Sequence, residues 1–386
     1  MHNWFNPEPG LERRARGLSR RDFGRMVALL AAGGSLPFYN ETALAQDIKA
    51  LSNIPPDAVR LNTNENPMGP CPAALEAIRK IVPQGGRYLL DQTFAFIEAM
   101  AASEGLPATH VLPGAGSSDL LHRSVLAFTS AGRPLVIANP GYEAPHRAAK
   151  FIGAKVVSVP LRKDYSHDPK AMAGADADAG MIYVCNPNNP TGTVTRKEDV
   201  DAIVANKPKG CIVVIDEAYL HFAKTATPST ELVANGKDVL VLRSFSKLYG
   251  MAGLRAGAAL AKPELLEKLR GYGGLPIMPA TGMAGATASL KEKTLVPERR
   301  KALADIRDDL CAWLDKKGYA FIPSEANMVL IDTKRPGAKT AEAMLKQHKV
   351  AIGRSWDALP NHVRVTIGTS DEMAQFKTAF ERVMEA

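Results

Sequence analysis

The sequence predicts an α/β fold, with a large domain built on a mostly parallel seven-stranded sheet that helices cover, and a smaller α+β domain toward the C-terminus. Short, continuously apolar runs alternate with helical patterns between residues 111 and 260, which is typical of sheets that are buried on both faces. A stretch rich in glycine and proline, residues 272–279, indicates a hinge. The smaller domain is expected beyond this hinge.

Length and composition are those of a globular protein. The 386 residues suffice for two domains, and 46% of them are hydrophobic against 23% charged. The net charge of +8 is not gathered into runs, and aromatic residues do not interleave with basic ones, so no nucleic-acid partner is expected. An anionic substrate or cofactor explains the basic excess more simply. The four cysteines lie too far apart for a zinc site, and neither a metal nor a disulfide framework is expected.

Residues 1–45 predict a twin-arginine export signal. Arg20-Arg21 precedes an apolar stretch at 26–38, and Ala43-Leu44-Ala45 fits a cleavage site of small residues. The apolar stretch is too short for a stable membrane span. We therefore expect the Tat translocase as a partner during export and a periplasmic location. The alternative is a short amphipathic surface helix in a cytoplasmic protein.

Helices are predicted where apolar residues recur at helical spacing, first at 73–81 and 93–104 and then at 120–128. A Gly-rich turn at 113–119 lies between a short strand and the last of these helices. Such a turn aims backbone N–H groups at an anion. A tight turn with an N-capping serine is the alternative.

Six apolar runs beyond this turn are strand candidates of the large domain: 134–138, 154–159, 181–185, 211–215, 239–242 and 255–260. Asn189, Asp216 and Lys247 follow the ends of three of these runs. Because polar groups at the carboxyl ends of parallel strands converge on one crevice, we expect these side chains to meet.

Long helical patterns fill residues 284–317 beyond the hinge, and three strand candidates follow: 319–323, 328–331 and 363–367. The sequence therefore divides into four parts: an export signal at 1–45, an N-terminal arm or small-domain segment at 46–74, a large domain at 75–272, and a linker helix with the small domain at 273–386.

Residues 244–257 carry a dense group of reactive side chains, with two serines, Lys247, three glycines and Arg255. A lysine in an apolar, glycine-bordered loop can act as an amine nucleophile toward a carbonyl. The arginine can return past a Gly-x-x-Gly to hold a phosphate. Asp216 at a buried strand end needs a cation, and a pyridinium ring would be one. Together these groups suggest pyridoxal phosphate. A surface lysine in a turn and a helix-capping aspartate are the alternatives.

Seven stretches match a known family in order: 64–70, 87–88, 114–119, 186–192, 216–219, 244–257 and 364–368. With them the chain resembles the fold-type-I, class I/II pyridoxal-phosphate-dependent aminotransferases, and among these the histidinol-phosphate aminotransferase subgroup. The resemblance implies an aspartate-aminotransferase-like fold and pyridoxal 5'-phosphate as the cofactor, bound by the large domain. It also implies an obligate homodimer with shared active sites.

The resemblance implies three catalytic residues. Lys247 would bond to the cofactor and move the proton of the reacting carbon, and Asp216 would pair with the pyridine nitrogen. Tyr219 would hydrogen-bond the phenolic oxygen together with Asn189. The other implied cofactor contacts are Tyr142 on the ring, and Gly116, Ser117, Ser118, Ser244, Arg255 and Tyr88 of the partner subunit on the phosphate.

For the substrate, the resemblance implies Arg364 as the partner of the carboxylate or a substitute anion, Arg354 as a second cationic partner, and Asn66 and Asn189 beside them. Each assignment has a plainer alternative. Tyr142 can be an ordinary core tyrosine, Tyr88 can simply pack in a turn, and the two arginines can be solvated surface charges.

Three departures from the subgroup bear on the substrate. Met68 stands where the subgroup has a tyrosine, and Ser118-Asp119 and Leu89-Leu90 also differ from its pattern. Methionine cannot donate a hydrogen bond to a phosphate, and histidine biosynthesis is cytosolic. We therefore expect an amine donor other than histidinol phosphate, such as an amino acid with an apolar or aromatic side chain.

The function predicted from these residues is that of a transaminase, which moves an amino group between an amino acid, or an amine resembling histidinol phosphate, and a 2-oxo acid. One alternative is a pyridoxal-phosphate-dependent lyase of the phosphothreonine-decarboxylase type. A second is a non-catalytic binding protein on the same scaffold. The complete set of lysine, aspartate, asparagine, tyrosine and arginine argues against the second alternative.

Overall fold

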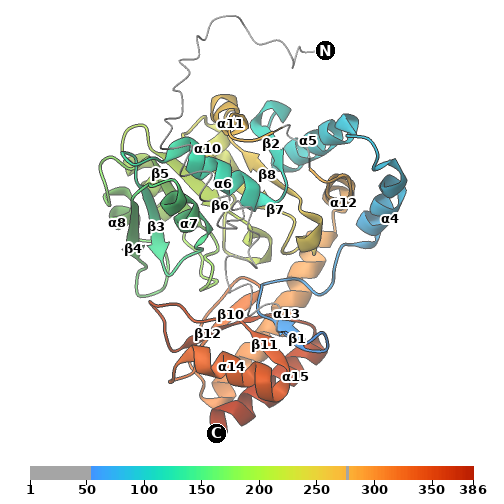
Figure 1. Ribbon diagram of the computed structural model, residues 1–386, viewed down its shortest axis with the longest axis vertical. Helices are drawn as coiled ribbons and strands as arrows, with labels where there is room; N and C mark the ends of the chain where they lie inside the picture. Colours follow the sequence, from blue (N-terminus) through green and yellow to red (C-terminus); the bar gives the residue numbers. More distant parts are fainter. Residues whose placement is uncertain (1–53, 275–277) are drawn as a thin grey trace, which may run out of the picture. The chain divides into compact units, whose positions relative to one another are not determined.

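The computed structural model of the chain describes residues 54–274 and 278–386 (Figure 1). The predicted export signal and the middle of the predicted hinge lie outside these residues. The hinge prediction therefore stays a prediction, as do the boundaries of the four predicted parts.

A seven-stranded sheet forms the centre of the large domain, in the order β2-β8-β7-β6-β5-β3-β4. Strand β8 pairs antiparallel with both of its neighbours, and all other pairs are parallel. The predicted mostly parallel sheet is thus confirmed. Its strands are β2 (Val111–Gly114), β3 (Leu135–Asn139), β4 (Val156–Pro160), β5 (Met181–Cys185), β6 (Ile212–Asp216), β7 (Val239–Ser244) and β8 (Gly257–Leu260).

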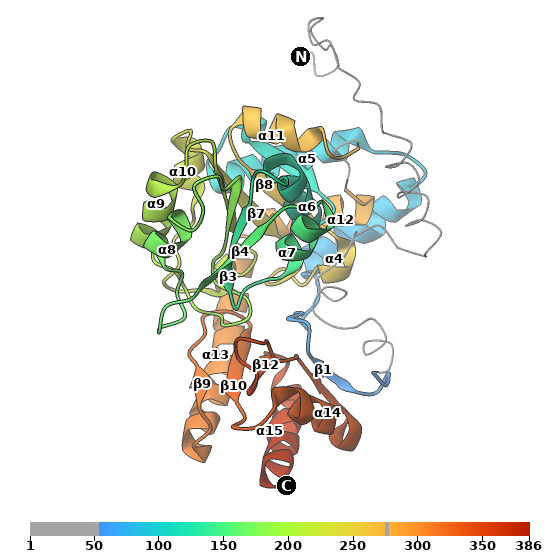
Figure 2. The ribbon, with the colours of Figure 1, turned by 60° about the vertical axis from the view of Figure 1, so that its left-hand side comes forward.

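Both faces of this sheet are buried, because alternate residues of each central strand enter different cores. In β5, Tyr183 and Cys185 pack in one apolar cluster, whereas Ile182 and Val184 pack in another. This explains why the strands appear in the sequence as continuous apolar runs. Figures 1 and 2 show helices on either side of the sheet.

The helices of the large domain divide between the two cores. Helices α6 (Ser117–Phe128), α7 (Ala144–Phe151) and α11 (Pro263–Arg270) contribute to the first. Those of the second core are α5 (Leu90–Glu104), α8 (Pro169–Ala173), α9 (Lys197–Asn206), α10 (Thr230–Ala234) and α12 (Ala280–Lys291), with α4 (Pro72–Ile81) packed beside α12. The three helices predicted before residue 130 are present as α4, α5 and α6.

The C-terminal domain combines helices with two small sheets. Its helices are α13 (Leu295–Lys317), α14 (Gly337–His348) and α15 (Ser370–Glu385). Strands β9 (Phe321–Ile322), β10 (Met328–Asp332) and β12 (His362–Thr366) form an antiparallel sheet in the order β12-β10-β9. No helix in the described part of the chain is both long enough and apolar enough to cross a membrane.

The second small sheet joins distant parts of the sequence. Strand β1 (Val59–Leu61) pairs in parallel with β11 (Val350–Ile352), and the sequence predicted neither strand. Because β1 is fixed in this way, the segment that follows it, residues 62–66, runs along the edge of the site described next.

Candidate active site

Side chains from three neighbouring strand ends line one pocket. Asp216 is the last residue of β6, Lys247 follows β7, and Asn189 follows β5. The three strands are adjacent and parallel, so their carboxyl ends lie at the same edge of the sheet. The other predicted residues that line this pocket are Ser117, Ser118, Tyr142, Tyr219, Ser244 and Arg255.

One end of the pocket has the properties of a phosphate site. Helix α6 begins at Ser117, and its first turn brings backbone N–H groups and a positive helix end to the pocket. The Nη2 atom of Arg255 lies 3.4 Å from Ser118 Oγ, and its Nη1 atom donates to Ser246 Oγ at 3.3 Å. Hydroxyls, backbone amides and a guanidinium are the groups that donate hydrogen bonds to a bound phosphate dianion.

Glycine is required where these parts meet. Gly116 has φ of 82°, and a Cβ atom there would lie 2.3 Å from Arg255 Nη2. A Cβ atom at Gly257 would lie 2.4 Å from the backbone nitrogen of Ser117. The absence of both side chains lets Arg255 and the start of α6 reach the same space, so this end of the pocket fits the phosphate group of pyridoxal phosphate.

Asp216 supplies a buried negative charge to the same pocket. Its carboxylate accepts hydrogen bonds from Tyr183 Oη at 2.9 Å and from the backbone N–H of Ala218 at 3.1 Å. Burial, and then the charge of Asp216, raise the pKa of Tyr183 far above its usual value, so the phenol stays protonated and donates. Both hydrogen bonds stabilise the ionised carboxylate, which suits a cationic ring nitrogen. The short helical turn that follows starts only at Leu220, so Asp216 is not its N-cap.

Lys247 places a primary amine in the same pocket. Its side chain is buried, and Nζ donates a hydrogen bond to the carbonyl oxygen of Thr63 at 3.3 Å. Nζ also lies 5.6 Å from the centre of the Tyr219 ring. The amine therefore faces the pocket beside Asp216 and Tyr219, where it can attack a carbonyl.

The hydroxyl of Tyr219 is held by two amides. Asn189 Nδ2 donates to it at 3.4 Å, and Asn64 Nδ2 donates to it at 3.0 Å. Arg364, which is 2% exposed, orients the first amide because its Nη1 atom donates to Asn189 Oδ1 at 2.7 Å. The alternative that Arg364 is a solvated surface charge is therefore wrong, because its side chain is buried.

A small cavity next to the pocket contains the second predicted arginine. Arg354 forms an ion pair with Glu143, and its guanidinium lies 4.6 Å from the centre of the Trp356 ring. Arg364 lies on the same tryptophan at 5.4 Å. Asn189 and Tyr142 line both the pocket and this cavity, so the two spaces are adjacent.

Five predicted residues do not line the pocket: Arg354 and Arg364, which line the small cavity beside it, and Gly116, Tyr88 and Asn66. Tyr88 is 75% exposed, and its predicted role requires a second copy of the chain. Asn66 donates from Nδ2 to the carbonyl oxygen of Leu248 at 2.8 Å and accepts from the backbone N–H of Met68. Its side chain thus holds the 66–68 loop against the lysine-bearing loop.

Sequence reasoning missed several residues of the site, above all Asn64, Tyr183 and Trp356. Tyr183 had a usable signal, because it lies on the same face of β5 as Cys185, which pairs with Asp216 in the neighbouring strand. Asn64 lies inside one of the matched stretches, but its contact with Tyr219 spans 155 residues of sequence. No local pattern reports such a contact.

Comparison with known proteins agrees with this geometry. The family model for aminotransferase class I and II matches residues 56–380. A histidinol-phosphate aminotransferase of Symbiobacterium thermophilum is 35% identical over 331 residues, which is 85% of this chain and 91% of the relative. An aromatic amino acid aminotransferase of Cutibacterium acnes is 34% identical, with 82% of this chain and 90% of the relative covered.

A solved structure agrees as well. Histidinol-phosphate aminotransferase from Sinorhizobium meliloti, in complex with pyridoxal-5'-phosphate, superposes with a TM-score of 0.81 at 27% identity, and 91% of this chain and 96% of that one are covered. The fold and site define an α/β enzyme with a lysine-centred cofactor pocket. The chain belongs to the class I and II aminotransferases. It is therefore an aminotransferase, and the cofactor of its family is pyridoxal phosphate.

Proposed function

We propose that this aminotransferase transfers an amino group from an amino acid with an apolar or aromatic side chain to a 2-oxo acid. The single observation that supports the chemistry is that Lys247, Asp216 and Arg255 line one pocket. When bound, pyridoxal phosphate acts as the electron sink for the bond that breaks at the substrate Cα.

The residues of the chain then have separate tasks. Arg255, with the hydroxyls of Ser117, Ser118 and Ser244 and the first amides of α6, holds the phosphate. Asp216 keeps a proton on the ring nitrogen, and Tyr142 stacks on the ring. Lys247 Nζ would take the proton from the substrate Cα and return it to the cofactor carbon on the other side of the amino nitrogen. Asn189 and Tyr219 hydrogen-bond the phenolic oxygen.

Arg364 decides which bond at Cα breaks. We propose that its guanidinium would hold the substrate carboxylate in place. With the carboxylate held, the Cα–H bond rather than the bond to the carboxylate would be the one that the cofactor weakens, which favours amino transfer over loss of carbon dioxide. Asn189 would lie beside the same carboxylate, because Arg364 Nη1 donates to Asn189 Oδ1 at 2.7 Å.

The choice of donor follows from the charges around the small cavity. Glu143 pairs with Arg354, so this arginine offers less net positive charge to a phosphate. Trp356 lines the same cavity, with its ring beside Arg354 and Arg364. Met68, which lies outside the lining of this cavity, is 48% exposed and donates no side-chain hydrogen bond. These features favour an apolar or aromatic side chain over a phosphomonoester, and one relative bears the name aromatic amino acid aminotransferase.

A donor screen tests this proposal. The cofactor-loaded protein is given aromatic, aliphatic and acidic amino acids and histidinol phosphate, each with 2-oxoglutarate, and kcat/KM is measured for each. We expect the aromatic and apolar donors to lead. Histidinol phosphate as the best donor would contradict the specificity, and carbon dioxide without amino transfer would contradict the reaction type.

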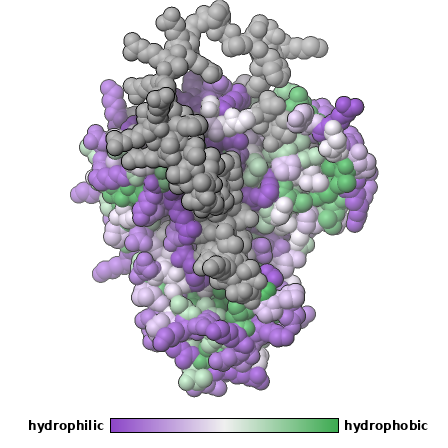
Figure 3. Space-filling model, viewed as in Figure 1, coloured by the Kyte–Doolittle hydropathy of each residue, from purple (hydrophilic) through white to green (hydrophobic). Residues whose placement is uncertain are grey.

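We also propose that the enzyme is a homodimer in which Tyr88 of the partner subunit reaches the cofactor phosphate. Exposed apolar side chains gather where α4 and α5 lie, among them Val82, Leu90 and Phe94 around Tyr88. Figure 3 shows apolar surface on this side. A patch of this kind marks an interaction surface in a soluble protein.

Subunit mixing tests the shared site. A Tyr88→Ala chain retains Lys247, and a Lys247→Ala chain retains Tyr88. If Tyr88 acts across the dimer, a mixture of the two variants regains activity in hybrid dimers, because one of their two sites has both residues. A mixture that stays as inactive as its parts, although light scattering shows dimers that exchange subunits, would contradict the shared site.

We further propose export through the twin-arginine pathway, on the strength of Arg20-Arg21 and the apolar stretch that follows them. Replacing both arginines with lysine and fractionating the cells provides the test. The wild-type chain is expected in the periplasm and the double variant in the cytoplasm. Equal distribution of the two proteins would contradict export by this route.

A further inference from the structure

We propose that Glu143, acting through Arg354, restricts the amino acceptor to 2-oxo acids with an uncharged side chain and disfavours 2-oxo diacids such as 2-oxoglutarate. This inference rests on the proposed function, since it concerns the second half of the same reaction. Glu143 directly precedes α7, and Arg354 lies between β11 and β12. The ion pair therefore connects the two domains at the small cavity beside the cofactor pocket.

Donor and acceptor occupy the same space in succession. The first half-reaction takes the amino group from the donor and consumes one water. The second gives the amino group to a 2-oxo acid and releases one water, so no oxidant or reductant is required. Because the second half-reaction is the reverse of the first with another side chain, Arg364 would hold the carboxylate of the acceptor as well. The side chain of the acceptor then lies where that of the donor lay.

A second carboxylate at the end of that side chain needs a cation when it leaves water. Among the described residues that line the pocket and the small cavity, the positively charged ones are Lys247, Arg255, Arg354 and Arg364. The first two serve the cofactor, and Arg364 serves the carboxylate next to the reacting carbon. Arg354 is the cation that remains. Glu65, a further charged residue of the pocket, is itself a carboxylate.

Arg354 is already held by several partners. Its Nη2 atom donates to a carboxylate oxygen of Glu143, and its Nη1 atom donates to the carbonyl oxygen of Ser355 at 3.1 Å. The guanidinium lies 4.6 Å from the centre of the Trp356 ring, within the range of a cation–π contact. Nε is buried and makes no hydrogen bond within the described part of the chain. The second carboxylate of an acceptor would thus meet a guanidinium whose charge Glu143 balances.

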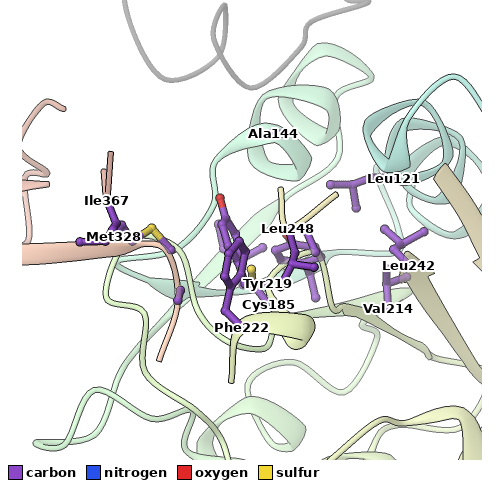
Figure 4. Packing of buried hydrophobic residues seen from close by; sticks show 14 of the residues in the cluster. Leu121, Ala144, Cys185, Val214, Tyr219, Phe222, Leu242, Leu248, Met328 and Ile367 are labelled. Atoms are coloured by element: carbon purple, nitrogen blue, oxygen red, sulfur yellow. The ribbon is translucent and has the colours of Figure 1, made fainter. Parts of the chain in front are cut away.

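The start of α7 holds Glu143 in this place. Ala144, the first residue of the helix, is completely buried in the core cluster that also includes Tyr219 (Figure 4). Arg147, one helical turn further on, comes only within 3.8 Å of Glu143 and is half exposed. An exposed pair of this kind contributes little, so Arg147 does not replace Arg354 as the partner of Glu143.

Two acceptors of matched size test the inference. In 5-methyl-2-oxohexanoate an isopropyl group replaces the second carboxylate of 2-oxoglutarate. The full-length, cofactor-loaded enzyme first takes up the amino group of an aromatic amino acid, and kcat/KM of each acceptor is then measured from the return of the visible band. We expect the uncharged acceptor to lead by at least about 10-fold, the effect of one hydrogen bond to a charged group. The kcat/KM of a donor belongs to the first half-reaction, so a slow acceptor leaves the order of donors unchanged.

Two variants connect this preference to the ion pair. Glu143→Gln keeps the size of the side chain and removes its charge, which leaves Arg354 with a net positive charge. The preference for the uncharged acceptor should fall by at least about 10-fold. Adding Arg354→Gln should abolish this gain of 2-oxoglutarate, since the cation is then absent. Both acceptors are compared on the same sample, so a loss of folded enzyme cancels in the ratio.

Glu264 provides the matched control. It lies in the first turn of α11, which has eight residues as α7 does, and it is exposed. Glu264→Gln removes the same charge outside the lining of the small cavity and should retain the wild-type preference. Calorimetry with glutarate and 5-methylhexanoate, which have no reacting carbonyl, adds a binding readout. Their Kd values should show the same order as the acceptors and the same change in Glu143→Gln.

Four results would overturn the inference: equal or faster use of 2-oxoglutarate by the wild type, an unchanged preference in Glu143→Gln, a gain that persists when Arg354→Gln is added, or an equal change in Glu264→Gln. An ion pair that only joins the domains would affect both acceptors alike. The wild-type comparison decides the acceptor class whether or not the variants fold. An enzyme that releases no 2-oxo acid from the donor would instead refute the proposed function.

Discussion

Replacing Gly116 with alanine should push Arg255 away from the phosphate end of the pocket. The new Cβ atom would lie 2.3 Å from Nη2 and 2.8 Å from Cζ of the guanidinium, closer than non-bonded atoms approach, so the side chain has to move. The backbone of Gly116, with φ of 82° and ψ of 161°, lies in a region that is essentially restricted to glycine. Alanine there costs about 1–3 kcal/mol in addition.

The expected consequence is weaker cofactor binding. A hydrogen bond to a charged group contributes about 1.5–3 kcal/mol, so losing the contact of Arg255 with the phosphate raises the cofactor Kd by about 10- to 100-fold. Titration of the cofactor-free protein with pyridoxal phosphate, followed by the visible absorbance of the bound form, measures this Kd. Denaturant unfolding of the same samples measures the loss of stability separately.

Gly105 provides the matched control. It also has a positive φ, of 66°, but an added Cβ atom would meet nothing within 4 Å. Gly105→Ala therefore introduces backbone strain far from Arg255, and its cofactor Kd should equal that of the wild type. The reasoning is refuted if Gly116→Ala binds the cofactor within about twofold of the wild type, or if the two variants lose affinity equally.

Three further predictions concern residues behind the site. Tyr183→Phe removes the hydrogen bond of 2.9 Å to Asp216 and should lower kcat about 10-fold with a nearly unchanged cofactor Kd; equal kcat values for variant and wild type would contradict this. Glu217→Gln leaves the buried Arg243 guanidinium with Glu104 as its remaining carboxylate partner and should lower the free energy of unfolding by about 3 kcal/mol, measured by denaturant titration; a loss below about 1 kcal/mol would show that the pair is dispensable. Burial lowers the pKa of His167 to about 4. Between about pH 6.5, the usual histidine pKa, and about pH 4, this side chain is therefore protonated in the unfolded chain and neutral in the folded one. The free energy of unfolding should therefore fall as the pH drops from 7 to 5, and His167→Gln should reduce that fall by about 2 kcal/mol; an unchanged pH dependence would argue against a neutral buried His167.

The strands of the large sheet could be predicted closely because their sequences are apolar throughout. Residues 181–185 were predicted as a strand and form β5, and 211–215 differs from β6 by one residue. Strands β1 and β11 were missed. Each has three residues, and each exists only because it pairs with the other across nearly 300 residues of sequence.

The same distinction holds for the site. Asp216, Asn189 and Lys247 could be predicted to meet, since each follows a strand of one parallel sheet. The contacts that orient them could not, because Asn64 reaches Tyr219 from a segment that β1 fixes, and Glu143 pairs with Arg354 from the other domain. Such contacts depend on where whole helices and strands pack, and the spacing of residues in the sequence does not predict this packing.

Amino transfer itself is tested most directly by one turnover without an acceptor. The purified, cofactor-loaded enzyme is mixed with an aromatic amino acid, and the 2-oxo acid and carbon dioxide released are measured together with the visible spectrum. We predict about one equivalent of 2-oxo acid per subunit, a spectral change that a 2-oxo acid reverses, no carbon dioxide, and none of these events in Lys247→Ala. Release of carbon dioxide without the 2-oxo acid, or undiminished turnover in Lys247→Ala, would contradict the proposed mechanism.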